Sequence, residues 1–429
     1  RTTNHYAFMM KASRTSTALS SRIGHIKTRT TNHYAFMMKA SRTSTARIQR
    51  LNCALLYCAM RYQPIGAAML FATLLPFATS PGAFAQSPRH TRNVVLIVSD
   101  GLRWQEIFQG ADSQLMNRKV GHVEDTAALR RDFSRDNAAS ARAALFPFIW
   151  NVVAKQGEIF GNHAVQSDAE VTNGFKFSYP GYNEMISGYP DPRINSNNAG
   201  PNPNLTVFEW LNTRPGIAGH VAVFGTWNEF PDIFNRTRSH LPIWAAFDPP
   251  PAATPPTARD SLLESIYTTT TRIWGDLSYD SFMQAEVDDY VTRMHPRVLF
   301  VGYGETDEWA HMGRYDMALK SGHQFDQFVQ ELWNRMQSMP QYHDSTTFII
   351  TTDHGRGNGL TAWTDHGADV AGAEAIWIAV MGPDTPAHGE RMHIARVTQS
   401  QIAATIAELL GENYSTAVPA AAPPLPIHC

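Results

Sequence analysis

The chain has 429 residues, 43% hydrophobic and 17% charged, which is enough for one large domain or two ordinary domains around a buried core. Its net charge of −2 hides an asymmetry, because residues 1–85 contain 11 Lys and Arg and no acidic residue, whereas the rest contains 25 basic and 38 acidic residues. An acidic body argues against sequence-independent nucleic-acid binding, but it leaves a small anionic substrate open where metal ions reverse the local charge.

The first 59 residues are basic, polar and internally duplicated. An 18-residue segment, Arg1–Ala18, recurs as Arg29–Ala46. Two copies do not build a solenoid, which needs at least three stacked repeats. We therefore interpret residues 1–59 as a disordered upstream extension, with a functional tail as the alternative.

Residues 60–85 have the organisation of a secretory signal peptide. Met60 and Arg61 are followed by the apolar stretch Ile65–Phe77 and by Ala83-Phe84-Ala85, a small-residue cleavage site before Gln86. A transmembrane anchor is the alternative, which Pro76 disfavours. The leader predicts a secreted or periplasmic protein without a stable membrane anchor. After cleavage only one of the cysteines, Cys53, Cys58 and Cys429, remains, so an intrachain disulfide is not expected.

From residue 86 to 415, apolar runs alternate with helical periodicity, which predicts a single α/β domain. The predicted strands are Val94–Val98, His220–Phe224, Val298–Val301, Thr347–Ile350 and Ala375–Val380. Helices are predicted over Ala127–Gln156, from Gly181, within Asp316–Ser338 and from Gln401 to Leu410, where Thr398 and Gln401 can form a capping box. Asp248–Arg259 and Asn195–Asn204 are predicted loops, and residues 416–429 are a Pro- and Ala-rich tail that we expect to be loosely ordered.

Candidate metal ligands follow three of the predicted strands. Asp100 follows Val94–Val98, Asp307 follows Val298–Val301, and Asp353 and His354 follow the strand around Ile350. Open α/β sheets place their chemistry at these strand ends. Taken singly, each Asp could be a turn cap, but carboxylates and imidazoles together are typical of a two-metal site.

Two further imidazoles complete this candidate ligand set. His311 lies four residues after Asp307, on the same face of a helix, so both side chains can reach one cation. His366 lies in a second Asp-His-Gly sequence, where Asp365 either faces water or orients a ligand.

Ser178 is the candidate nucleophile. It precedes a predicted helix start at Gly181, where free backbone N–H groups favour an anion. A serine hydroxyl beside a metal ion loses its proton readily and needs no His–Asp relay.

The order of these residues resembles that of the alkaline phosphatase superfamily, nearest to its nucleotide pyrophosphatase/phosphodiesterase-like branch. Ser178-Tyr179-Pro180-Gly181-Tyr182 stands where that branch has Thr-Phe-Pro-Asn-His, and Ser187-Gly188 stands where it has Thr-Gly. The resemblance extends from Asn93 to His366. It implies a large, mostly parallel central sheet with helices on both faces.

The resemblance also implies two zinc ions. Asp307, His311 and His366 would hold one ion, and Asp100, Asp353, His354 and the Ser178 oxygen would hold the other. Asn198, with Asn197 as the alternative, would bind a phosphate oxygen. Manganese and iron also suit a mixed Asp/His ligand set.

Departures from the family patterns narrow the predicted activity. Sulfatases of the superfamily need Arg four residues after the residue matured to formylglycine, and Tyr182 stands there. No arginine near Ser178 clearly matches the phosphate clamp of monoesterases, Arg193 being a weakly placed candidate, so we predict a secreted hydrolase of small phosphodiesters acting through phosphoserine at Ser178. Phosphomonoesterase, sulfatase-like hydrolase and non-catalytic binding protein are the alternatives. The natural substrate and the oligomeric state are not determined by the sequence.

Overall fold

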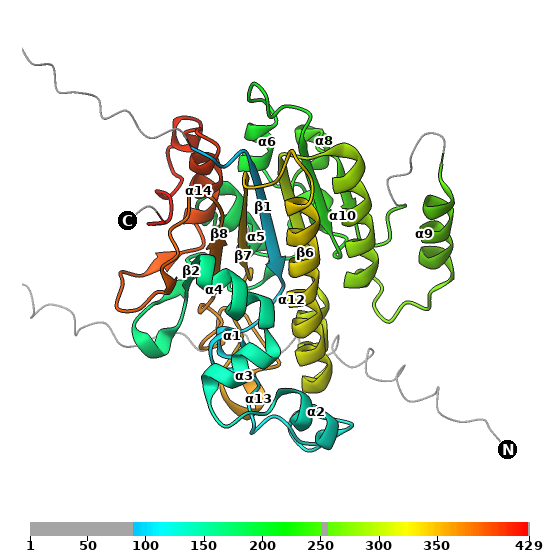
Figure 1. The fold of residues 1–429 in the computed structure, drawn as a ribbon, viewed down its shortest axis with the longest axis vertical. Helices are drawn as coiled ribbons and strands as arrows, with labels where there is room; N and C mark the ends of the chain where they lie inside the picture. The colour runs from blue at the N-terminus through cyan, green and yellow to red at the C-terminus, as the bar shows by residue number, and fades with distance from the viewer. Residues whose placement is uncertain (1–88, 250–255, 428–429) are drawn as a thin grey trace, which may run out of the picture. The chain divides into compact units, whose positions relative to one another are not determined.

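The computed structural model describes residues 89–249 and 256–427 (Figure 1). The predicted extension 1–59, the leader 60–85, part of the loop Asp248–Arg259 and all three cysteines lie outside these residues. Among the helices that are described, none combines the length and the hydropathy that crossing a membrane requires.

An eight-stranded sheet forms the centre of the fold, with the strand order β5-β4-β6-β1-β7-β8-β2-β9. The five strands from β5 to β7 are parallel, and β8 runs antiparallel to both of its neighbours. β3 and β10 form a separate parallel pair. The strands are β1 Asn93–Ser99, β2 Gly157–Phe160, β3 Ala169–Glu170, β4 Val221–Gly225, β5 Ile243–Ala245, β6 Val298–Tyr303, β7 Thr346–Thr351, β8 Ile378–Met381, β9 Gly389–Glu390 and β10 Val397–Thr398.

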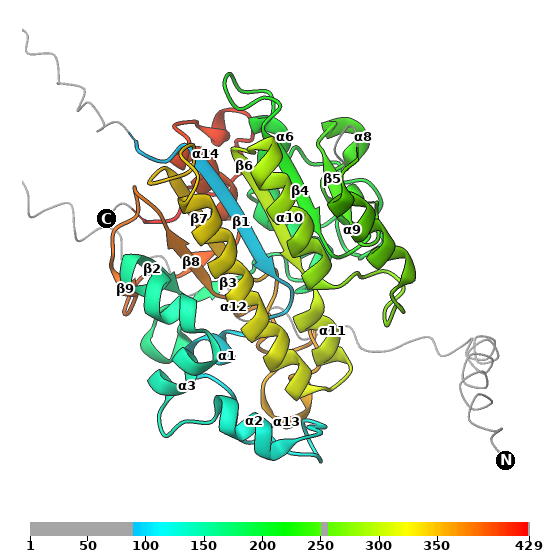
Figure 2. The same cartoon turned by 45° about the vertical axis from the view of Figure 1, so that its right-hand side comes forward.

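Helices cover both faces of the sheet, as Figure 2 shows for α12 and α10 on one face and α14 and α6 on the other. One hydrophobic core lies between the sheet and α12. A second core lies between the opposite face of the sheet and the helices α14 and α5. The helices are α1 Trp104–Gln109, α2 Thr126–Phe133, α3 Ala138–Leu145, α4 Ala154–Gln156, α5 Ser178–Ser187, α6 Val207–Leu211, α7 Phe230–Ile233, α8 Arg236–Ser239, α9 Ala258–Thr269, α10 Asp280–Met294, α11 Glu305–His311, α12 Tyr315–Gln337, α13 Gly359–Ala362 and α14 Gln401–Leu409, with short turns η1 Ile149–Val153, η2 His163–Val165 and η3 Tyr414–Thr416.

The predicted fold class is confirmed: the sheet is mostly parallel, is buried on both faces and lies between helices. Its centre explains why distant residues meet. β1 pairs with β6 on one side and with β7 on the other, so that Ser99 lies opposite Tyr303 and Val98 lies opposite Thr351. The three strand ends that precede the candidate ligands are therefore neighbours at one edge of the sheet.

The segment Ala127–Gln156 is helical as predicted, but it is not one continuous helix. The segment is divided into α2, α3, η1 and α4. Asn137 caps a new helix by accepting a hydrogen bond from the Ser140 N–H, and α3 ends before Phe146, because Pro147 disfavours a helical conformation of the residue before it and begins the next helical stretch. β8 begins at Ile378, three residues later than predicted. Only half of the predicted capping box forms, with the Thr398 N–H donating to the Gln401 side chain.

The expectation of a loosely ordered C-terminal tail is wrong for residues 416–427. Leu425 and Ile427 are buried in the core on the α14 face. The Leu425 N–H donates to the Thr405 hydroxyl of α14, and the Ala422 N–H donates to the carbonyl of Gly188 at the end of α5. Apolar residues among the prolines thus dock the tail on the domain.

Gly181 lets α5 approach the end of β7 closely. A Cβ at this position would lie 2.3 Å from the backbone oxygen of Asp353. We therefore expect Gly181→Ala to lower the free energy of unfolding by about 1–3 kcal/mol, as overpacking does in well-packed cores, and to displace Ser178. Gly275→Ala is the matched control, because a Cβ there meets no atom within 4 Å. If chemical denaturation shows that the two variants are equally stable, the close approach of α5 to the end of β7 is contradicted.

Candidate metal centre and nucleophile

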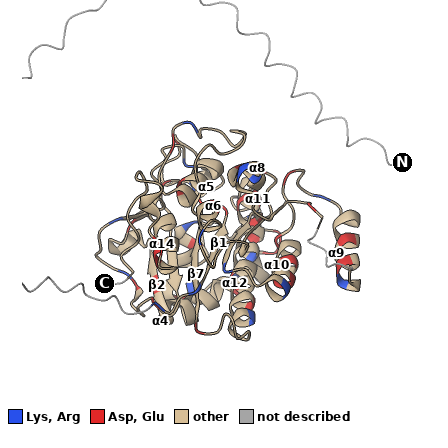
Figure 3. Cartoon of the chain, turned by 90° about the horizontal axis from the view of Figure 1, so that it is seen from above, with Lys and Arg blue, Asp and Glu red and all other residues tan. Residues whose placement is uncertain are grey.

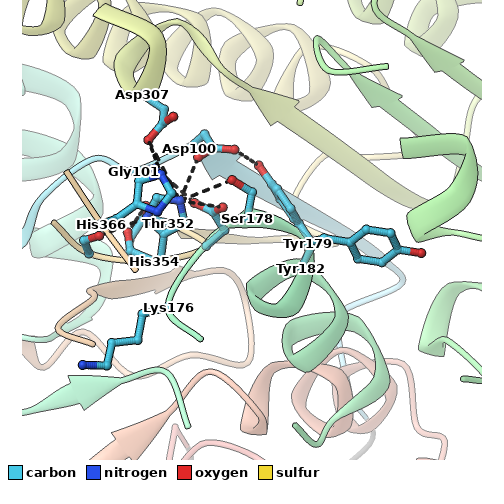
Figure 4. A network of polar contacts seen from close by, with 12 residues as sticks. Asp100, Gly101, Lys176, Ser178, Tyr179, Tyr182, Asp307, Thr352, His354 and His366 are labelled. Atoms are coloured by element: carbon cyan, nitrogen blue, oxygen red, sulfur yellow. Dashed lines mark hydrogen bonds and ion pairs between the residues drawn. The ribbon is translucent and has the colours of Figure 1, made fainter. Parts of the chain in front are cut away.

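Asp100, Asp353 and His354 converge at the ends of β1 and β7, beside the first residue of α5. His354 Nε2 lies 3.3 Å from Asp100 Oδ1, 3.4 Å from Asp353 Oδ2 and 3.4 Å from Ser178 Oγ. Figure 4 shows Asp100, Ser178 and His354 pointing toward one another, whereas Lys176 points away and pairs with Glu374. All four side chains of this group are buried.

In each of the three ligand side chains, Asp100, Asp353 and His354, one polar atom is hydrogen-bonded within the protein and the second polar atom is available to a metal ion. Asp353 Oδ1 accepts from the Gly101 N–H at 3.0 Å, and Asp100 Oδ2 accepts from the Tyr182 hydroxyl at 3.0 Å. His354 Nδ1 lies 2.9 Å from the Gly355 carbonyl, which fixes the tautomer with a lone pair on Nε2. Asp100 Oδ1 and Asp353 Oδ2 have no hydrogen-bond partner among the described residues. Buried oxygens that face an imidazole nitrogen and lack donors fit a cation between them.

The electrostatics of this group favour a bound cation. Burial raises the pKa of Asp100 well above its usual value, and repulsion from Asp307 adds to this. Burial likewise raises the pKa of Asp353, with repulsion from Asp100 as the next cause. A bound divalent cation offsets such a cost, because it favours the ionised carboxylates.

Asp307, His311 and His366 form the second group. His311 Nε2 lies 3.1 Å from Asp307 Oδ2 and 2.9 Å from His366 Nε2, while His366 Nε2 lies 3.8 Å from Asp307 Oδ1. Ligands around a tetrahedral zinc ion are separated by about 3.3 Å, so this spacing suits one ion. Burial and the neighbouring His354 lower the pKa of His366 to about 2, which keeps its imidazole neutral, as a ligand must be.

His354 lies between the two groups. Its Nε2 is 3.9 Å from Asp307 Oδ1, so Asp307, His354 and His366 also have ligand atoms close enough for one ion. The resemblance assigns His354 to a single ion, and the structure places it within reach of both. Asp365, the other open question in this segment, is exposed.

Arg356 is a residue of this centre that the sequence analysis missed. Its guanidinium donates to the Asp307 backbone oxygen at 3.0 Å and also to Asp307 Oδ1. Burial opposes ionisation of Asp307, but the Arg356 and His311 charges outweigh it and hold the pKa of that carboxyl well below its usual value. Its position in the sequence could have predicted this role, because Arg356 directly follows Asp353-His354-Gly355. A buried arginine also needs an acidic partner.

A cavity of about 390 Å³ opens onto both groups and is lined by Asp100, Ser178, Asp307, His311 and His366. Asn197 and Asn198 also line it. The Asn197 side chain accepts from the Tyr179 N–H at 3.0 Å, which ties this loop to α5. Arg193 does not line the cavity, because it pairs with Asp191 and Asn204.

The mouth of the same cavity is acidic, with Glu229, Asp276 and Glu308 in its lining. Burial and repulsion from Asp307 and Asp276 raise the pKa of Glu308 to about 6. Among the described residues that line the cavity there is no lysine or arginine.

Comparison with protein families finds a match in the C-terminal part of the chain. Residues 258–414 match the model of the Metalloenzyme superfamily. This segment includes Asp307, His311, Asp353, His354 and His366, but neither Asp100 nor Ser178. The match agrees with the predicted superfamily for this segment alone, and it does not distinguish the phosphodiesterase branch. No protein with a curated description matches significantly.

Solved structures with a similar fold include an alkaline phosphatase superfamily protein from Vibrio parahaemolyticus, at 13% identity over 76% of this chain and 69% of the other, with a TM-score of 0.44. A putative sulfatase from Bacteroides thetaiotaomicron has 13% identity over 75% and 71%, with a TM-score of 0.47. The phosphonate monoester hydrolase of Agrobacterium radiobacter has 12% identity over 75% and 74%, with a TM-score of 0.43. None of these likenesses assigns an activity to this chain.

Proposed function

For a chain whose residues 258–414 match the Metalloenzyme superfamily, we propose hydrolysis of phosphate esters, with diesters as the preferred substrates, through a phosphoserine intermediate at Ser178. One observation supports this above all others. Ser178 Oγ lies 3.4 Å from His354 Nε2, which belongs to the first ligand group and lies 3.9 Å from Asp307 Oδ1 of the second. A hydroxyl, a set of buried cation ligands and a cavity that reaches both are what nucleophilic phosphoryl transfer requires.

In the proposed reaction, Ser178 Oγ attacks phosphorus in line with the leaving alcohol oxygen. The Oγ–P bond forms, the bond from phosphorus to the leaving oxygen breaks, the hydroxyl proton passes to solvent and the alkoxide takes up a proton. Water then attacks the phosphoserine, which breaks the Oγ–P bond and restores the hydroxyl. Divalent ions held by the two ligand groups would lower the pKa of the hydroxyl and stabilise the leaving oxygen. In the first turn of α5 the Ser178 N–H would favour the negative charge on the phosphoryl oxygens, because the Tyr179 N–H donates to Asn197, Pro180 has no N–H and the Gly181 N–H donates to the Phe177 carbonyl.

The cavity lining supports diesters over monoesters. A doubly charged monoester is best held by a bidentate arginine. Arg193, Arg356 and Lys176 are each engaged with an acidic partner, and none of them lines the cavity among the residues described. Tyr182, in the position of the sulfatase maturation arginine, donates instead to Asp100, which disfavours the sulfatase alternative. From the leader at residues 60–85 we propose export to the periplasm or medium, and from the donor set we propose zinc as the metal.

The proposal is tested by measuring metal content together with rates on three nitrophenyl substrates. We expect the bis-nitrophenyl phosphodiester to be hydrolysed with the highest kcat/KM, ahead of nitrophenyl phosphate and nitrophenyl sulfate. A highest rate on the monoester would favour the phosphomonoesterase alternative, and a highest rate on the sulfate would favour the sulfatase-like one. Metal-loaded protein that hydrolyses none of them would favour a non-catalytic binding protein.

A further inference from the structure

Glu184 is a fully buried carboxylate that the proposed mechanism does not use. It lies in α5, six residues after Ser178, and is 0% exposed. Among the residues that the structure describes, no arginine, lysine or histidine pairs with it. Figure 3 shows charged side chains on the outer helices α8 and α9, and there Arg236, Arg238 and Glu264 are exposed. A buried charge without a cationic partner is costly unless hydrogen bonds satisfy it.

The hydrogen bonds to Glu184 come mainly from the turn that leads into α5. Five donor groups reach its two oxygens: the N–H and the hydroxyl of Thr172 at 2.9 and 2.7 Å, the N–H and the side-chain amide of Asn173 at 2.9 and 3.0 Å, and the Ser400 hydroxyl at 2.7 Å. An ionised carboxylate only accepts, so it satisfies all of these donors at once. The carboxylate therefore fixes the backbone of Thr172 and Asn173 against the helix that begins with Ser178.

The rest of this turn has a backbone conformation that the chain does not adopt freely. The Asn173 side-chain oxygen accepts from the N–H groups of Phe175 and Lys176 at 3.0 and 2.8 Å. Lys176 has a φ of +56°, in the left-handed region that residues other than glycine rarely occupy. Because Glu184 holds Asn173 and Asn173 holds this turn, the point at which Ser178 enters α5 depends on the buried carboxylate.

A second connection joins the same network to the metal ligands. Ser400, which donates to Glu184, directly follows Gln399. The fully buried Gln399 side-chain amide donates to the backbone oxygens of Thr352 and Asp353 at 3.1 and 2.8 Å. The turn before the nucleophile and the backbone at the end of β7 are therefore tied to the same two consecutive residues.

We propose that Glu184 is a positioning residue for the nucleophile and holds the Ser178 hydroxyl at the place from which it attacks phosphorus. This inference rests on the proposed function. Glu184 acts through the turn 172–177 and through Ser400, since the polar contact of Ser178 Oγ is with His354. A displacement of roughly 1 Å at a reacting atom costs about 10²-fold in rate. A rigid turn before Ser178 thus explains why the fold maintains a buried charge here.

The test compares Glu184→Gln with Glu158→Gln, which makes the same change at another carboxylate that is 0% exposed. Glu158 lies on β2, is separated from β7 by β8, and pairs with Arg391. On the bis-nitrophenyl phosphodiester, we expect metal-loaded Glu184→Gln to lower kcat by roughly 10–100-fold. Its KM and metal content are expected to stay unchanged, because the cavity lining and the ligands keep their contacts. Glu158→Gln is expected to keep the wild-type kcat, even where it lowers Tm equally.

Hydrogen exchange of backbone amides gives a readout that needs no turnover. In Glu184→Gln, the N–H groups of residues 172–176 are expected to exchange roughly tenfold faster than in the wild type and in Glu158→Gln, while those of β7 keep their wild-type rates. If the wild type hydrolyses no ester, the proposed function fails and exchange decides. Faster exchange in Glu184→Gln alone supports the hold of Glu184 on the turn, and equal exchange refutes it.

The remaining outcomes separate a positioning role from a merely structural one. A wild-type kcat in Glu184→Gln would overturn the inference and leave the hydrolase proposal standing. Equal losses of kcat in Glu184→Gln and Glu158→Gln would also overturn it, because activity would then follow stability. If Glu184→Gln does not fold, Thr172→Val removes one of the donors alone. We expect this variant to lose part of its kcat at unchanged KM, and a wild-type kcat in it would refute the proposal.

Discussion

Ser178→Ala is expected to lower kcat by roughly 10³-fold or more, because no other group replaces the attacking oxygen in a covalent mechanism. Among the described residues, the polar contact of Ser178 Oγ is the 3.4 Å approach to His354 Nε2, and Ser178 is buried at the first position of α5. Removing the hydroxyl therefore leaves the ligand carboxylates and their anchoring hydrogen bonds in place. We expect the variant to retain its full metal content and nearly unchanged unfolding, measured by metal analysis and thermal denaturation.

Ser178→Thr is the matched variant for this experiment, because it keeps a hydroxyl at the same position. It is expected to retain measurable turnover and to form a phosphorylated residue that can be trapped at low pH, whereas the alanine variant forms none. Residual activity of Ser178→Ala at the level of Ser178→Thr would refute the nucleophile assignment. Loss of metal from the alanine variant would instead show that the serine oxygen is needed to hold an ion.

Removal of metal is expected to abolish turnover and to destabilise the fold. Chelation would leave Asp100, Asp307 and Asp353 close together and buried, with Asp100 Oδ1 and Asp353 Oδ2 unsatisfied. An ion that binds only the folded state stabilises it by about 2.7 kcal/mol when present at 100 times its dissociation constant. We expect chelator to lower Tm, and zinc to restore both Tm and activity. If metal analysis shows that the chelator has removed the metal and Tm is unchanged, the two-metal centre is contradicted.

Single-ligand variants distinguish the two ions. His354→Ala is expected to reduce bound metal toward zero, because its Nε2 faces both ligand groups. His311→Ala is expected to remove about one equivalent, because its contacts are with Asp307 and His366 alone among the ligand candidates. Equal losses in the two variants, measured by metal analysis of dialysed protein, would show that His354 does not bridge the groups.

The sequence located most of the sheet and the side chains that meet at its edge. Continuous apolar runs predicted β1, β4, β6 and β7 within one or two residues, because strands buried on both faces need uninterrupted apolar side chains. The Asp307–His311 spacing predicted a shared helical face, and α11 brings the two side chains to 3.1 Å. The order of the tail after residue 416 and the breaks within the helical segment Ala127–Gln156 were missed, since they depend on docking and capping partners rather than on local composition.

By itself, the sequence determined which ligand types stand at the ends of which strands, and this sufficed to predict a two-metal site; phosphate-ester hydrolysis was implied by the resemblance of the residue order to a known superfamily. The tertiary structure alone decided that β1 lies between β6 and β7, that His354 faces both ligand groups, that Arg356 holds Asp307 and that Tyr182 holds Asp100. It also brought Glu229, Asp276 and Glu308 to one cavity mouth from separate segments. Local periodicity reports which face of an element is buried, whereas strand order and long-range contacts arise from packing the whole core, and a single chain's residue pattern does not encode them locally.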